Sequence, residues 1–171
     1  MYYIFAFILL VITNVSFAQD NSKTEGLMTN YASFIMYHRF GENRYPSTNI
    51  KKEQFLKHIN ELLKPKYNVI NIEQALDAIN NKKLVKDRSV VITIDDAYSS
   101  VFNYAWPIFK KYNIPFTLFV STDVIDNNTP GYMNWEEIRI LRDNGITIGS
   151  QTKSHPHMYK LNKQKIISEL S

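Results

Sequence analysis

The stretch Ser89-Val90-Val91-Ile92-Thr93-Ile94-Asp95-Asp96 decides the fold. Its first six residues are largely β-branched and nearly continuous in apolar character, which is typical of a parallel strand buried on both faces. The run ends in two adjacent carboxylates, which are costly at the end of a buried strand unless they are paired or bind a metal. Two interpretations stay open at this point. The carboxylates form a functional pair, or they cap the helix that follows, a position that suits Asp.

Strand-like and helix-like segments alternate on both sides of this run. The apolar spacing predicts strands at 33–38, 68–71, 89–94, 115–120 and 146–150. It predicts helices at 50–64, 72–81 and 99–112, a helix from Trp135 that Gly145 caps, a last helix at 161–170, and a polar loop at 123–133. In the 72–81 helix, Ala75, Leu76 and Ile79 are expected to form the apolar stripe.

This alternation predicts an α/β fold with about five parallel strands and intervening helices. Two architectures satisfy the pattern equally well: an incomplete β/α barrel and an open doubly wound sheet. In either case the functional groups are expected where the strands end, because parallel α/β folds carry their sites at the carboxyl edge of the sheet.

A second predicted strand end also carries unusual chemistry. The segment Gly149-Ser150-Gln151-Thr152-Lys153-Ser154-His155-Pro156-His157 places two imidazoles directly after a strand. Neutral His is a common zinc ligand, so the pair is a candidate for metal binding. Taken alone, such a pair is more often a pair of surface-loop histidines.

Together the two strand ends resemble the first two motifs of the NodB-like polysaccharide deacetylases, carbohydrate esterase family 4. Thr93-Ile94-Asp95-Asp96-Ala97-Tyr98 is similar to the family's Thr-Phe-Asp-Asp-Gly motif, with Ile for Phe and Ala for Gly. The family's His-Ser/Thr-x-x-His motif corresponds to Gln151-Thr152-Lys153-Ser154-His155. The segments 105–120 and 134–145 also resemble the family, and Met36-Tyr37-His38-Arg39 resembles envelope poly-N-acetylglucosamine deacetylases.

The resemblance implies a partial (β/α) barrel and a role for each motif residue. Asp95 would be the general base, and Asp96 and His155 would be metal ligands. Gln151 stands where the family has its first metal His; its neutral amide is a weaker zinc donor than imidazole, so the site is expected to bind a divalent metal, by preference zinc, only weakly. His157 or a water is the alternative third ligand.

The implied reaction is metal-dependent hydrolysis of N-acetyl groups on an envelope polysaccharide, which releases acetate and leaves an amine. Tyr98 and His38 are expected to border the substrate. The family's later motifs, with an Arg that orients the base and a His general acid, do not occur before Ser171, so residues 32–171 are expected to be an incomplete deacetylase domain. The alternative is a catalytically impaired or vestigial fragment that binds carbohydrate.

The first 18 residues predict export. Met1 to Ala18 is uncharged, largely apolar, and ends in Ser16-Phe17-Ala18, which is typical of a cleaved signal peptide. A retained anchor is the alternative. Residues 19–31 are expected to be a flexible lead-in, and the mature protein is expected in the periplasm or cell envelope without a stable membrane span.

Composition excludes several other classes. The chain has 171 residues, 44% hydrophobic and 21% charged, which indicates one globular domain, and it has no Cys, which excludes disulfides and Cys-based zinc sites. Its net charge of +4 is spread along the chain, so no nucleic-acid partner is expected. A phosphoacceptor receiver domain fails on the export signal and on the lack of a Lys directly at the end of the 146–150 strand.

Trp135 is expected in the core and His58 at the surface.

Overall fold

The computed structural model describes residues 27–171, and the predicted signal peptide lies outside the described residues. The central strand is β7 (Ser89–Ile94), and every one of its residues is buried. It belongs to a parallel sheet of five strands with β2 (Ser33–Tyr37), β5 (Asn68–Ile70), β8 (Thr117–Val120) and β9 (Thr147–Ser150). The predicted α/β class with a parallel sheet is confirmed.

Strand β7 pairs with three neighbours. It pairs with β2 along residues 90–94, with β5 along 89–91 and with β8 along 93–94. A strand has only two hydrogen-bonding edges. The β7 residues that pair with β2 include residues that also pair with β5 or with β8. Strand β2 therefore lies along one edge of β7, and β5 and β8 lie one after the other along the opposite edge. Strand β9 follows β8, which gives the order β2-β7-β8-β9.

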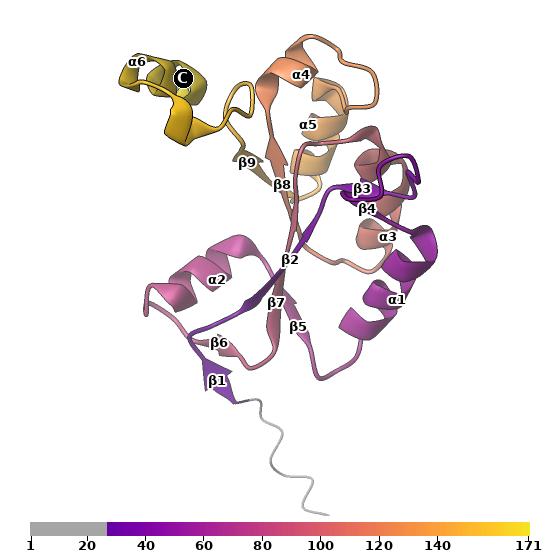
Figure 1. Ribbon diagram of the computed structural model, residues 1–171. Coiled ribbons are helices and arrows are strands. Elements are labelled where there is room, and N and C mark those ends of the chain that lie inside the picture. The colour runs from indigo at the N-terminus through magenta and orange to yellow at the C-terminus, as the bar shows by residue number, and fades with distance from the viewer. Residues whose placement is uncertain (1–26) are drawn as a thin grey trace, which may run out of the picture.

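The alternation of side chains along β7 explains why the whole strand is buried. Val90, Ile92 and Ile94 belong to one apolar cluster, which α1 (Lys52–Leu62), α3 (Trp106–Lys111) and α5 (Trp135–Asp143) complete. Val91 faces the other way, into a smaller cluster completed by α2 (Ile72–Ile79). Figure 1 shows α1 and α3 on one side of the sheet and α2 on the other.

Local sequence explains where the helices begin. Helices α2 and α5 start at Asn71 and Asn134, whose side chains accept a hydrogen bond from the backbone N–H three residues on. Gly145, with φ +85°, lies just beyond the end of α5, where a left-handed residue is needed. Helix α6 (Lys163–Leu170) starts at Asn162 in the same way.

Two stretches differ from the sequence-based expectation. The expected loop at 123–133 contains α4 (Thr122–Asp126), which buries Ile125 and is tied to the β9 end because the Asp123 N–H donates to the carbonyl of Lys153. The expected single helix at 99–112 begins with a π-helical turn, Val101–Ala105, before α3. Pro107 explains the break, because it has no N–H to continue the α-helical ladder.

Short strands at the amino end also escaped prediction. Strand β1 (Met28–Thr29) pairs antiparallel with β6 (Val85–Lys86), so this end of the expected lead-in is part of the folded domain. Strands β3 (Arg39–Phe40) and β4 (Asn49–Ile50) form a small parallel pair beside α1. They are two residues long, too short for a periodic signal.

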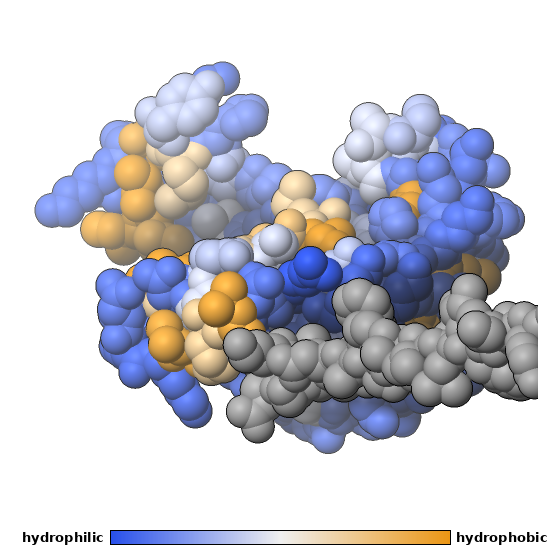
Figure 2. Space-filling view, turned by 90° about the horizontal axis from the view of Figure 1, so that it is seen from below, coloured by the Kyte–Doolittle hydropathy of each residue, from blue (hydrophilic) through white to orange (hydrophobic). Residues whose placement is uncertain are grey.

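The expected apolar stripe of α2 is wrong in part. Ala75 and Ala78 are fully buried, whereas Leu76 and Ile79 are about half exposed, at 47% and 51%. Other exposed large apolar side chains include Phe34 and Met36 on β2 and Ile167 and Leu170 on α6. In Figure 2, hydrophobic side chains accordingly gather on the left of the face seen from below and in the hollow at its middle. Among residues 27–171, no helix is long and apolar enough to cross a bilayer.

Candidate functional site

Polar side chains gather at the edge of the sheet where the parallel strands end. His38 follows β2, Asp95 and Asp96 follow β7, and Gln151 follows β9. The hydrogen bonds between neighbouring strands continue one residue past the ends of β7 and β9. The Asp95 N–H donates to the carbonyl of Tyr37, and the Gln151 N–H donates to the carbonyl of Val120, both at 2.9 Å. The two motifs that are 55 residues apart in the chain therefore meet in space, at the place expected for α/β folds.

Asp95 lies between its own strand and the end of β2. Its Oδ2 is 4.0 Å from Nε2 of His38, and only 17% of its side chain is exposed. Burial raises the pKa of the Asp95 carboxyl; the His38 imidazole opposes this rise and the neighbouring carboxylate of Asp96 adds to it. A carboxylate with a raised pKa is a stronger base, so Asp95 has the environment that proton abstraction needs.

Asp96 and Ala97 turn the chain sharply away from β7. Both stand in the left-handed region, with φ +69° and +50°, which L-residues adopt at a cost of about 1–2 kcal/mol. The segment 131–133 braces the turn, because the Met133 N–H donates to the carbonyl of Ala97 at 2.8 Å and the Ser99 N–H to that of Gly131 at 2.9 Å. The turn sends Asp95 toward His38 and Asp96 toward a different pocket.

That pocket has a volume of about 230 Å³ and contains polar and aromatic groups from four segments. Its lining consists of Asp96, Tyr98, Ser121, Val124, Tyr132, Ser154 and His155. The Tyr98 ring packs against the Tyr132 ring, with centroids 4.8 Å apart, and under the Arg39 guanidinium at 3.3 Å. Burial raises the pKa of the Tyr98 phenol, and Tyr132 and Asp96 raise it further. Sequence patterns gave no signal for Tyr132, and they placed Arg39 in a family-like segment without predicting its contact with Tyr98.

Gln151 and His155 meet beside Asp96. Oε1 of Gln151 accepts a hydrogen bond from the Asp96 N–H at 3.1 Å, and Nε2 of Gln151 lies 3.0 Å from Nε2 of His155. Gln151 is half-buried, whereas His155 is exposed. Thr152 and His155 have positive φ angles of +64° and +54°, and the His155 N–H donates to Oγ1 of Thr152. The loop is therefore folded tightly enough to bring residues 151 and 155 together.

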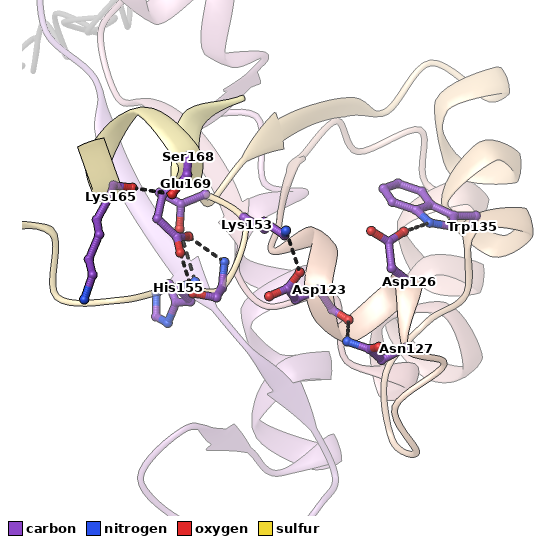
Figure 3. Close-up of polar contacts among 11 residues, drawn as sticks. Asp123, Asp126, Asn127, Trp135, Lys153, His155, Lys165, Ser168 and Glu169 are labelled. Atoms are coloured by element: carbon purple, nitrogen blue, oxygen red, sulfur yellow. Dashed lines mark hydrogen bonds and ion pairs between the residues drawn. The ribbon is translucent and has the colours of Figure 1, made fainter. Parts of the chain in front are cut away.

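Helix α6 anchors this loop from outside. Glu169 accepts hydrogen bonds from the backbone N–H and the hydroxyl of Ser154, at 2.8 and 2.7 Å. These contacts lower the pKa of the Glu169 carboxyl. Figure 3 shows Glu169 reaching the loop beside His155 and Lys153 turned toward Asp123 of α4, 3.9 Å away. Nothing in the local sequence pointed to Glu169.

A second hollow, of about 360 Å³, lies beside the end of β2. Its lining includes Tyr37, His38, Arg39 and residues 47–50, and it ends at His58, whose Nδ1 is 2.8 Å from the Tyr37 hydroxyl. His38 thus borders both this hollow and Asp95. His58 is exposed, as expected, and Trp135 is partly buried against the core, with its Nε1–H donating to Asp126.

The sequence of the described region matches a known family. Residues 82–171, which hold both strand-end motifs, match the family model for polysaccharide deacetylases. The chain belongs to the polysaccharide deacetylase family. The resemblance inferred from Asp95-Asp96 and the 151–155 loop is confirmed at this level.

Individual deacetylases are similar to the chain over most of its length. YxkH of Bacillus subtilis (strain 168), named as a polysaccharide deacetylase, is 26% identical over 137 residues, which are 80% of this chain and 48% of that protein. The de-N-acetylase of Aggregatibacter actinomycetemcomitans has a TM-score of 0.62 at 26% identity, covering 71% of this chain and 54% of that one. The deacetylase PplD of Streptococcus pyogenes, solved with acetate, has a similar fold, with a TM-score of 0.72 at 19% identity, covering 84% and 65%. The chain spans about half the length of the curated relative that it matches.

Deacetylases of this family generally depend on a metal. Catalytic zinc usually has three good protein ligands and a water. Asp96 and His155 are strong metal ligands. The third ligand position holds Gln151, whose Oε1 already accepts a hydrogen bond from the Asp96 N–H. His157 packs its ring against Tyr159, and within residues 27–171 no group of three or more His, Asp or Glu side chains is placed to hold an ion. The donor set does not fit the three-ligand site.

Proposed function

We propose that the chain acts in the hydrolysis of N-acetyl groups on an envelope polysaccharide, with Asp95 as the general base. The observation that carries the proposal is the half-buried Asp95 at the strand end, with His38 4.0 Å away and a pKa raised by burial. Family membership supports the same reaction, and one relative of similar fold is named a de-N-acetylase. The sugar polymer is not specified by these residues.

The reaction assigns a clear task to Asp95. Its carboxylate takes a proton from a water as the water oxygen attacks the acetyl carbonyl carbon. The C–N bond then breaks, acetate leaves, and the nitrogen takes up a proton and stays on the sugar as an amine. Tyr98 and His38 are proposed to contact the sugar, Tyr98 from the pocket that Asp96 lines and His38 from the hollow beside the end of β2.

Acetate release from N-acetylglucosamine oligomers tests the proposal. The native chain is expected to release acetate slowly, and Asp95→Asn is expected to lower the rate by about 100-fold or more, the usual effect of losing general base help. Asp143→Asn, a change on the exposed end of α5, is the matched control and should leave the rate unchanged. Equal rates for the native chain and Asp95→Asn would contradict the role of Asp95.

A second function is favoured by one specific observation. The amide of Gln151 stands at a metal ligand position of the family, which supports a catalytically impaired domain that binds N-acetylated polysaccharide without cleaving it. Calorimetric binding of the same oligomers, with no acetate released at any zinc concentration, would select this alternative. Oligomer binding should then weaken in Tyr98→Ala but not in Asp143→Asn.

We also propose export to the cell envelope, from the pattern of Met1 to Ala18 and the family's polysaccharide substrates. The mature protein is expected to begin at Gln19. Sequencing of the amino terminus of the envelope-associated protein checks this, and full-length protein confined to the cytoplasm would rule it out.

A further inference from the structure

Gln151 connects the ends of β7 and β9 through both atoms of its side-chain amide. The Asp96 N–H can only donate a hydrogen bond, so the atom that faces it at 3.1 Å must be the Gln151 oxygen. The amide nitrogen therefore faces His155, with 3.0 Å between the two Nε2 atoms. An amide nitrogen also only donates, so Nε2 of His155 must be the acceptor.

This order of donors and acceptors fixes the state of His155. A neutral imidazole that accepts at Nε2 carries its proton on Nδ1. The Nε2 lone pair, which would otherwise be free for a metal, is engaged by Gln151. The contact thus competes directly with any ion for the same pair of electrons.

The backbone groups of Gln151 are also hydrogen-bonded. Its backbone N–H donates to the carbonyl of Val120 at 2.9 Å, and its carbonyl accepts from the Ser121 hydroxyl at 3.2 Å. All four polar groups of the residue therefore have partners within the fold. Gln151 therefore links two parts of the fold and has no unpaired polar group left to bind an ion.

The two residues that the amide joins both stand in strained backbone conformations. Asp96 has φ +69° and His155 has φ +54°. Such conformations persist only where the surroundings hold them, and they often mark functional sites. The Gln151 amide supplies a hydrogen bond to each side of the gap, which is the cross-linking role that a metal plays when its ligands come from two strand ends.

We propose that Gln151 is a positioning residue whose amide replaces a metal ion as the cross-link between the Asp96 and His155 segments, so that the site is assembled without metal and His155 is held with its proton on Nδ1. This inference goes beyond the proposed reaction and holds for either candidate function. The cross-link by Gln151 does not depend on whether the site is catalytically active.

The test compares the full chain with Gln151→Met and Gln151→His, in EDTA and in excess zinc. Native protein at about pH 8, above the ordinary histidine pKa of about 6.5, should show the Nδ1–H tautomer of His155 by nitrogen-15 NMR. Zinc should change neither the His155 signals nor the melting temperature of the native protein. In Gln151→Met, which keeps the length but loses both hydrogen bonds, the tautomer preference should disappear and exchange of the His155 amide should rise about fivefold or more.

Gln151→His should make the melting temperature rise with zinc, because an imidazole then joins Asp96 and His155. His155→Ala in the native background serves as the assignment control for the NMR signals. A native chain whose His155 carries its proton on Nε2, or whose melting temperature rises with zinc, would overturn the proposal. Both measurements use native protein, so the result does not depend on whether a variant folds.

Discussion

Oδ2 of Asp95 lies 4.0 Å from Nε2 of His38, which joins the ends of β7 and β2. The parallel register explains the contact, because Tyr37 and Ile94 are direct partners and the next residues of both strands continue side by side. His38 opposes the rise in the Asp95 pKa that burial causes, without cancelling it. The carboxylate is therefore kept in a place that disfavours its charge.

Asp95→Asn is expected to stabilise the fold at neutral pH. A carboxyl whose folded pKa is raised contributes stability that is present below the unfolded pKa, about 3.9, and is lost as the pH rises through the folded pKa. The advantage of Asp95→Asn over the native chain should therefore grow as the pH rises. Urea denaturation in EDTA across the pH range measures this, and a native chain that is more stable than the variant at neutral pH would be inconsistent with it.

Gly149→Ala is expected to destabilise the protein by about 1–3 kcal/mol, the usual effect of overpacking. A Cβ at residue 149 would come within 2.5 Å of the Phe119 ring, its register partner on β8. In combination with Phe119→Leu, which removes the ring, the cost should be smaller than the sum of the two single changes. A double-mutant cycle by urea denaturation checks this, and strict additivity would show that the ring is not the obstacle.

Phe55→Ala is expected to cost about 3–5 kcal/mol, because a large buried aromatic side chain leaves a cavity. Phe55 is fully buried and packs against Phe40 and Phe109, with ring centroids 4.7 and 5.2 Å apart. The neighbouring Leu56 is 43% exposed, so Leu56→Ala is the matched control and should cost less than about 1 kcal/mol. Similar losses for both variants would mean that α1 faces the core differently.

The sequence predicted those parts of the fold whose signal is periodic and local. The β7 run, the helix expected within 50–64 and the Gly145 cap follow from side-chain spacing and turn chemistry, and all three occur in the structure. Helix α4 did not give such a signal: five residues are too few for a period, and it is held by Ile125 and by contact with the β9 end. The π-helical turn depends on Pro107, and not on the spacing of apolar residues.

The sequence predicted which polar residues come together at the strand ends, but not the hydrogen bonds between them. Asp95, Asp96 and His155 could be proposed from the sequence because their residue types at strand ends match a chemical pattern. The bridge made by Gln151 could not be found in this way, because it depends on which atom of the amide faces the Asp96 N–H. Arg39 over the Tyr98 ring and Glu169 at Ser154 are likewise long-range contacts, between residues 59 and 15 positions apart.

The Glu169 contact is expected to order the His155 loop in a pH-dependent way. The pKa of the Glu169 carboxyl is lowered, chiefly by the hydrogen bond from the Ser154 N–H and then by that from the Ser154 hydroxyl. The contact is fully present above the ordinary glutamate pKa of about 4.3 and is lost as the pH falls through the lowered folded value. The Ser154 amide signal in NMR should therefore move with the titration of Glu169. Glu169→Gln should abolish that movement, whereas Glu136→Gln, on the exposed face of α5, should leave it intact. A Ser154 signal that titrates identically in Glu169→Gln would mean that α6 does not anchor the loop.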